Sequence, residues 1–281
     1  MLPTSISQAW LPLQSVFSEL MVSLSKIIAL FMNFLVKCIL PFCFALLFLS
    51  CVDDRRIPVV QDYTVHEVDI KELSGLDFDK DQSALIACGD KGVVARISFD
   101  GIVNELYSLR SDMEGVTVDS NTGDIYLAVE RVQEIHKLAA PDYTEETLSF
   151  PVQEAVSSSY GNDGLEAVEY YKDDILFVAS QYDANLWQYR TDGTLLSKIS
   201  LSSFASEIAG LYYDDEAGLL WVTDSEMGKI FICTPEGELQ ATYDISFIKN
   251  AESICVDRNR NCIWVGSDEE PSRLYRFDVR F

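Results

Sequence analysis

The chain has 281 residues and a formal net charge of −24, with 45 Asp and Glu against 21 Lys and Arg. Its length admits one large domain or two small ones, because all-β propellers and barrels of about 200–250 residues form single domains. A chain this acidic repels phosphate backbones, which excludes nucleic acid as a main partner and favours cations.

An apolar leader precedes the acidic part of the chain. Residues 27–50 are almost wholly apolar, and Lys37 is their one charged residue. Counted from Met32, the segment MNFLVK is short and positive, the next 13 residues are apolar, and Cys51 follows at once. This order is typical of a signal peptide. Because the apolar segment after Lys37 is short for a bilayer span, cleavage before a lipid-modified cysteine fits it better.

The residues Phe48-Leu49-Ser50-Cys51 resemble a bacterial lipobox, although leucine is usual at the first position and a smaller residue at the second. We therefore expect a membrane-anchored lipoprotein of the bacterial cell envelope, on the periplasmic side or at the cell surface. The alternative is an uncleaved signal anchor that begins near Ile27. The predicted organisation is an export signal at 1–51, a tether at 52–62 and a globular domain at 63–281.

One phrase recurs five times in the globular part. The copies are LSGLDFD (73–79), MEGVTVD (113–119), LEAVEY (165–170), IAGLYYD (208–214) and AESICVD (251–257). Their starts are spaced by 40, 52, 43 and 43 residues, which are periods typical of propeller blades.

Each copy continues with a short apolar strand and a third strand that often ends in Asp-Gly or Glu-Gly, which favours an antiparallel meander. A fourth strand completes four copies, but the chain stops three strands into the fifth. We predict that residues 64–70 supply the missing strand and close the ring. The fold class is thus all-β, a single propeller of five four-stranded blades. Six blades is the fallback, although the extra loop Ser157–Asp163 is short for a further blade.

Acidic residues recur at the second position of the phrase. Because the first strand of a blade lines the channel and the second runs antiparallel beside it, the start of one and the end of the other share a face. The two positions lie 14 to 16 residues apart in every copy. The second-position residues are Ser74, Glu114, Glu166, Ala209 and Glu252, and the second-strand ends are Asp90, Glu130, Ser180, Asp224 and Ser267 with Asp268 beside it.

These side chains are predicted to converge on one mouth of the channel. Glutamates crowded around an axis repel unless some bind a proton or a cation, and dense oxygen ligands suit Ca²⁺. The predicted metal ligands are Glu114, Glu166, Glu252 and Asp224, and the other mouth residues are Ser74, Asp90, Glu130, Ser180 and Asp268. Two alternatives are that each glutamate accepts backbone N–H groups of its own or the next blade, or that the carboxylates are catalytic.

The repeats resemble a known family. The segments SGLDFD, MEGVTVD, GNDGLEAVEY, VTDSEMGKIF, AESICVD and SRLYRF are similar to the SdiA-regulated (YjiK-like) propeller family, over about residues 70–281. Ala167 and Ser253 depart from it, because glycine usually follows the glutamate there. The resemblance implies an envelope-associated propeller with a calcium site and a distant likeness to esterase-like phytases, and it brings no established activity.

The favoured function is a non-enzymatic binding module, expected to be monomeric, with an acidic mouth for Ca²⁺ and a small-molecule or protein ligand. The alternative is a calcium-dependent hydrolase of the phosphoesterase or lactonase kind. Against an enzyme, the only histidines are His66 and His136, and the sequence has no G-x-S-x-G, Walker or HExxH motif.

Aromatic residues and cysteines support two smaller predictions. A protein-interaction scaffold would use loop aromatics such as Tyr160, Tyr182 and Trp187, but Trp187, Trp221 and Trp264 lie in strand patterns and are expected to pack between blades. The cysteines of the globular part are expected to be small buried hydrophobes rather than disulfide partners. They are Cys88, Cys233, Cys255 and Cys262.

Overall fold

The structure is a computed structural model that describes residues 57–108, 110–145, 149–152 and 164–281, with four helical leader residues. The chain divides into two compact units, Met1–Arg55 and Arg56–Phe281. Cys51, the lipobox, the loop Ser157–Asp163 and Tyr160 lie outside the described residues. Within the described part, no helix has the length and apolar character needed to cross a membrane.

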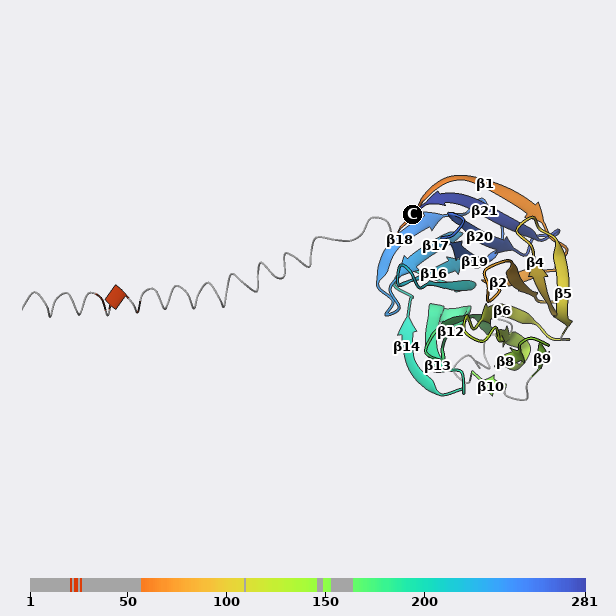
Figure 1. Cartoon of the computed structure of the whole chain (residues 1–281), viewed down its shortest axis with the longest axis horizontal. Helices are drawn as coiled ribbons and strands as arrows, with labels where there is room; N and C mark the ends of the chain where they lie inside the picture. The colour runs from red at the N-terminus through yellow and green to blue at the C-terminus, as the bar shows by residue number, and fades with distance from the viewer. Residues whose placement is uncertain are drawn as a thin grey trace, which may run out of the picture. The chain divides into compact units, whose positions relative to one another are not determined.

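Five antiparallel sheets make up the second unit and form a five-bladed β-propeller, as predicted (Figure 1). Blade one contains β2 (Leu73–Phe78), β3 (Leu85–Gly89), β4 (Val93–Ile97) and β5 (Val103–Ser108). Blade two contains β6 (Met113–Val118), β7 (Ile125–Val129), η3 (Glu130–Val132), β8 (Glu134–Ala139), β9 (Thr144–Glu145) and β10 (Phe150–Pro151). Blade three contains β11 (Leu165–Lys172), β12 (Ile175–Ser180), η4 (Tyr182–Ala184), β13 (Asn185–Arg190) and β14 (Leu195–Ser200). Blade four contains β15 (Gly210–Asp214), β16 (Leu219–Asp224), β17 (Lys229–Cys233) and β18 (Leu239–Asp244). Blade five contains β19 (Ala251–Asp257), β20 (Cys262–Ser267), β21 (Arg273–Arg280) and β1 (Val59–Glu67).

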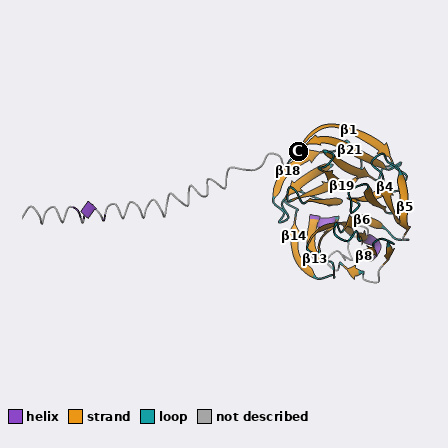
Figure 2. Cartoon of the chain, in the orientation of Figure 1, coloured by secondary structure: helices purple, strands orange, loops and turns teal. Residues whose placement is uncertain are grey.

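Strands make up most of each blade (Figure 2). Burial falls from the inner to the outer strand of each blade. The inner strands β2, β6, β11, β15 and β19 contact one another around the ring. The inner strand β2 is buried along its whole length, whereas the outer strand β14 is exposed at alternate residues. The predicted Asp-Gly turns connect the third and outer strands, and Gly193 has the positive φ of 88° that such turns require.

The core consists of five hydrophobic clusters, each between two neighbouring blades. Successive residues of one strand serve opposite neighbours, so Ile254 packs toward blade four and Cys255 toward blade one. Three tryptophans are fully buried in this core, as predicted for Trp187, Trp221 and Trp264. The four cysteines of the propeller are buried and free, which agrees with the prediction that they act as small hydrophobes.

The strand β1 closes the ring by pairing antiparallel with β21, as the sequence predicts (Figure 1). The closing strand covers Val59–Glu67, so it begins and ends earlier in the sequence than the predicted range of 64–70. The tether prediction is therefore wrong for residues 59–62. The physical reason is the ladder itself, in which Val59 pairs with Arg280, while the Tyr243 hydroxyl donates a hydrogen bond to the Pro58 carbonyl.

Candidate functional site

The channel along the inner strands has two mouths. The start mouth is where the inner strands begin, at Leu73, Met113, Leu165, Gly210 and Ala251. The end mouth is where they finish, at Phe78, Val118, Lys172, Asp214 and Asp257. All predicted site residues belong to the start mouth.

A β-bulge places the predicted glutamates at the start mouth. The strand register shifts between Met113 and Gly115, between Leu165 and Ala167, and between Ala251 and Ser253, so each glutamate is the extra residue of its bulge. The same shift occurs around Ser74 in blade one. Bulges redirect side chains and are common beside functional sites. Four of the five second-position residues are therefore released from the sheet pairing in the same way.

Glu114, Glu166 and Glu252 converge closely enough to affect one another. The pKa of Glu114 is raised to about 8, first by burial and then by the charges of Asp90, Glu130 and Glu252, against a hydrogen bond from Ser74. Burial also raises the pKa of Glu166 well above its ordinary value, with Glu114 and Glu252 as the next causes. The pKa of Glu252 rises to about 8 through burial and then Asp268.

Asp224 and the serines at the ends of the second strands form hydrogen bonds with the backbone of the loops instead. The fully buried Asp224 carboxylate accepts hydrogen bonds from the backbone N–H groups of Ser206 at 2.8 Å, Glu207 at 3.2 Å and Met227 at 2.8 Å. The Ser180 hydroxyl donates to the Tyr182 carbonyl at 2.9 Å. These side chains fix the connections at the start mouth rather than face a ligand.

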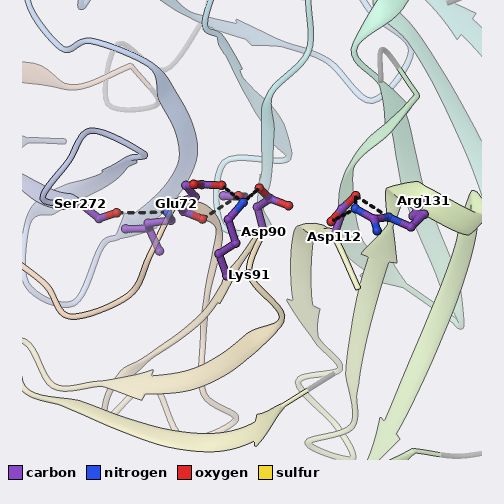
Figure 3. Close-up of polar contacts among 8 residues, drawn as sticks. Glu72, Asp90, Lys91, Asp112, Arg131 and Ser272 are labelled. Atoms are coloured by element: carbon purple, nitrogen blue, oxygen red, sulfur yellow. Dashed lines mark hydrogen bonds and ion pairs between the residues drawn. The ribbon is translucent and has the colours of Figure 1, made fainter. Parts of the chain in front are cut away.

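Basic side chains neutralise part of the acid at this mouth (Figure 3). Lys91 forms ion pairs with Asp90, at 2.6 Å, and with Glu72. Arg131 pairs with Asp112 at 2.7 Å. The predicted mouth residue Asp90 therefore has a counter-ion within the protein.

Sequence analysis missed Glu207, a half-buried residue of the connection into blade four. Its charge helps to raise the pKa of both Glu166 and Glu252, and its own pKa is raised by burial. Blade four has Ala209 at the second position, and Glu207 supplies a carboxylate two residues earlier. The sequence did contain a signal for this residue, because Glu207 comes shortly before a copy that has alanine at the second position.

The donor set at the start mouth does not form a metal cage. In the described ranges, no group of three or more His, Cys, Asp or Glu side chains is arranged to hold a metal ion. Asp224 is committed to backbone donors, and Glu114, Glu166 and Glu252 form no such group. The predicted Ca²⁺ site therefore stays a prediction.

Between the mouths the inner strands approach one another closely. A Cβ atom on Gly75 would lie 2.7 Å from the Val116 nitrogen, and one on Gly115 would lie 2.8 Å from the Glu166 carbonyl oxygen. Only glycine permits this approach between neighbouring blades. The cavity lined here by Ser74, Glu114 and their neighbours has a volume of about 10 Å³.

The end mouth opens into a pocket of about 650 Å³, and all five blades contribute to its walls. The floor includes Asp77 and Glu169, the aromatic wall includes Tyr212, and the rim includes Ser120 and Asn259. No residue of this pocket was predicted as a site residue.

Side chains at the fifth position of the phrase connect the inner strands at the pocket floor. Asp77 Oδ2 accepts the N–H of Val118 at 2.7 Å, and Glu169 Oε1 accepts the N–H of Tyr213 at 2.8 Å. The Thr117 hydroxyl accepts the N–H of Tyr170 at 2.8 Å. Each bond runs from one blade to the next. The predicted structural role of inter-blade acceptors is thus filled by these residues, and not by the glutamates at the second position.

The two floor carboxyl groups meet at one hydroxyl. Thr117 Oγ1 lies 2.9 Å from Asp77 Oδ2 and 3.3 Å from Glu169 Oε2. Burial raises the pKa of Asp77 to about 6, and burial followed by the Asp77 charge raises the pKa of Glu169 well above its ordinary value. A hydroxyl has one hydrogen to donate, so Thr117 can donate to only one of these two carboxyl groups at a time.

An ion pair replaces these side-chain acceptors between blades four and five, where Tyr212 and Cys255 occupy the fifth position. Arg258 Nε donates to both oxygens of Asp214, at 2.7 and 2.9 Å, and its Nη2 donates at 2.6 Å. Asp214 is only 4% exposed. This pair lies at the pocket wall and joins the last two blades.

The chain has only distant similarity to known proteins. No family model matches the chain, and no curated protein matches it. Among solved structures, it is similar to the selenomethionine-substituted virginiamycin B lyase from Staphylococcus aureus, with 12% identity and a TM-score of 0.49 over 78% of this chain and 100% of that one. It is also similar to a streptogramin B lyase structure, with 15% identity and a TM-score of 0.47 over 72% of this chain and 66% of that one. At these values no activity can be transferred, and the resemblance to the SdiA-regulated family is not confirmed.

Proposed function

We propose that the protein is an envelope-anchored β-propeller that binds a small polar ligand in the end-mouth pocket. The observation that carries this proposal is the pocket of about 650 Å³ to which every blade contributes. Ligand sites for small molecules have volumes of about 300–1,000 Å³ and a few convergent polar groups. Asp77, Glu169 and the Tyr212 hydroxyl are such groups.

The fold supports a preorganised site. The floor is held by hydrogen bonds between successive inner strands, from Val118 to Asp77, from Tyr170 to Thr117 and from Tyr213 to Glu169. A ligand that enters a rigid site loses less free energy to ordering of the protein. This argument favours a binding module in which the propeller presents the pocket and the lipid at Cys51 provides the anchor.

The pocket is tested by filling it. Ser120 is an exposed turn residue on the rim, and Ser120→Trp is expected to abolish binding of small polar compounds found by thermal-shift screening of the full chain in detergent. The matched control is Ser202→Trp, because Ser202 is an exposed turn serine beyond the start-mouth end of β14. Ligands that bind the Ser120→Trp protein as tightly as the native one would refute the pocket as the site.

A cation site at the start mouth is the second candidate function. It is favoured by Glu114, Glu166 and Glu252, whose pKa values are raised first by burial and then by the charges of neighbouring carboxyl groups. The test is calorimetric titration of the full chain with Ca²⁺, repeated for Glu114→Gln and Glu252→Gln. Absence of heat and of any change in thermal stability would exclude a Ca²⁺ site, and with it the hypothesis of a calcium-dependent hydrolase.

The anchor and the family are also proposals. We expect Cys51→Ser to release the protein from membranes, and retention of the protein would indicate a signal anchor instead. Membership of the SdiA-regulated family rests on the repeat phrases and would be tested by solving a propeller of that family and comparing the bulged glutamates.

A further inference from the structure

The walls of the end-mouth pocket carry an excess of negative charge. Seven carboxyl side chains line it, against the three basic side chains Lys80, Lys172 and Arg258. Arg258 is already bonded to Asp214, and the Lys172 ammonium lies 4.6 Å from the centre of the Tyr171 ring. The pocket therefore favours a ligand of positive charge.

Within the part of the chain that the structure describes, the floor carboxyl groups receive no charged donor. Asp77 accepts from two backbone N–H groups and from the Thr117 hydroxyl, at 2.6 to 2.9 Å. Glu169 accepts from the Tyr213 N–H, and its other oxygen contacts Thr117. Both residues are under a tenth exposed, at 7% and 3%. Buried carboxylates are usually paired with a cation or protonated.

Tyr212 of blade four, the neighbour of the blade that carries Glu169, completes the set. It lines the same pocket, and its ring lies edge-on to Phe78 with centroids 6.1 Å apart. Burial and the charges of Asp77, Glu169 and Asp214 are among the causes that raise its pKa. Throughout the described residues, no partner accepts or donates a hydrogen bond at its hydroxyl, which leaves that group for a ligand.

We propose that the end-mouth pocket selects a small polar molecule that carries a primary ammonium group, bound between Asp77, Glu169 and Tyr212. The inference rests on the proposed function and names the ligand class for the same site. An ammonium group donates three hydrogen bonds, which suits two carboxyl groups and a phenol oxygen. The rim residues Ser120 and Asn259 offer hydrogen bonds to the polar remainder of the molecule.

The test uses three hexoses of similar size and different charge. Glucosamine, glucose and glucuronate are titrated calorimetrically into the full chain in detergent. We expect glucosamine to bind about tenfold or more tightly than glucose, and glucuronate not to bind, because an ammonium–carboxylate contact is much stronger than a neutral one. Added salt is expected to weaken the binding of glucosamine.

Variants locate the bound ammonium group. Tyr212→Phe removes a hydroxyl that has no hydrogen-bond partner among the described residues, so it is expected to weaken glucosamine binding several-fold without loss of folding. Glu169→Gln keeps the acceptor for the Tyr213 N–H and supplies an N–H toward Thr117, so it is also expected to fold and to bind glucosamine about tenfold more weakly. Ser202→Trp, beyond the start-mouth end of β14, is the control and is expected to leave the affinity unchanged, and Glu114→Gln tests whether the cation binds at the start mouth instead.

The outcomes separate the ligand class from the proposed function. Equal binding of glucose or glucuronate, lost in Ser120→Trp, would overturn the ammonium class and leave the pocket as a binding site. Glucosamine binding that persists in Ser120→Trp and disappears in Glu114→Gln would assign the cation to the start mouth and overturn the inference. Absence of binding by all three sugars would also overturn it, whereas the proposed function would then depend on the wider thermal-shift screen.

Discussion

The two mouths of the channel both gather carboxyl groups from the inner strands, but they use them differently. At the start mouth, Glu114, Glu166 and Glu252 are the extra residues of β-bulges, and Glu114 and Glu252 help to raise the pKa of Glu166. At the end mouth, Asp77 and Glu169 accept N–H groups of the next blade and line a pocket of about 650 Å³. The difference teaches that position within a repeat decides whether an acidic residue holds the ring together or repels its neighbours.

The largest effect is expected from Asp77→Ala at the end mouth. The substitution leaves the N–H groups of Phe78 and Val118 and the Thr117 hydroxyl without their acceptor. Buried unsatisfied polar groups cost about 1–3 kcal/mol each, so for three such groups we expect a loss of about 3 kcal/mol or more in the free energy of unfolding measured in urea. The control Asp215→Ala alters an exposed pocket carboxylate and is expected to change stability by about 0.5 kcal/mol or less. Similar values for the two variants would contradict a structural role for the floor.

A somewhat smaller loss in the free energy of unfolding is expected from Arg258→Ala. The buried Asp214 would lose the guanidinium that donates to both of its oxygens. Because Arg258 is partly exposed, we expect about 2–3 kcal/mol, below the usual cost of breaking a fully buried pair. Arg258→Lys is expected to restore only part of this stability, since lysine lacks the planar guanidinium that donates to both carboxylate oxygens at once. Full recovery with lysine would show that charge alone joins blades four and five.

The start mouth is expected to make stability depend on pH. Glu114 and Glu252 have ordinary pKa values of 4.5 that are raised to about 8 in the folded protein, so the folded state binds more protons than the unfolded state in this interval. The free energy of unfolding should therefore be greatest at the acidic end and should fall as pH rises toward about 8. Asp77, with its pKa raised to about 6, contributes in the same direction over a lower range.

Variants assign that pH dependence to the start mouth. Glu114→Gln and Glu252→Gln remove titrating groups, so their Tm values should decline less than that of the native protein between pH 6 and pH 9. For a domain of this size, 1 kcal/mol corresponds to about 2–4 °C in Tm. An unchanged slope in both variants would refute the crowding of these glutamates.

The smallest effect is expected from Lys91→Ala. Its ion pairs with Asp90 and Glu72 are at the surface, where such contacts contribute about 0–1 kcal/mol. Urea unfolding should hardly change. A loss above about 2 kcal/mol would mean that this ion pair counteracts repulsion among the start-mouth carboxyl groups, and would sharpen the contrast with the end mouth.

The repeat allowed the fold to be predicted in detail. The phrase and its spacing gave five blades, and the shortage of one strand in the fifth copy predicted the closing strand. The start of that strand at Val59 was missed, because its pairing with Arg280 and the Tyr243 contact with Pro58 depend on partners far away in sequence.

The site was less accessible to sequence reasoning. Acidic residues at the second position drew attention to the start mouth, and the convergence of its glutamates follows from the repeat. Asp77 and Glu169 lie in the same phrases, but they look like isolated polar residues in apolar strands. Their roles depend on which backbone N–H group of the next blade lies opposite each carboxyl group, and on the pocket that they line. Neither property can be obtained from one chain's pattern.

The closing strand has a consequence for the kinetics of folding. Blade five combines β1 with β21, so its outer ladder joins residues more than 200 positions apart in the sequence. Long-range pairing of this kind slows folding, because loop entropy is lost before the contacts form. A chain that emerges with its N-terminus first must carry β1 unpaired while four blades are made. Until β21 arrives, β1 presents open strand edges to other chains, and completion of the ring removes them.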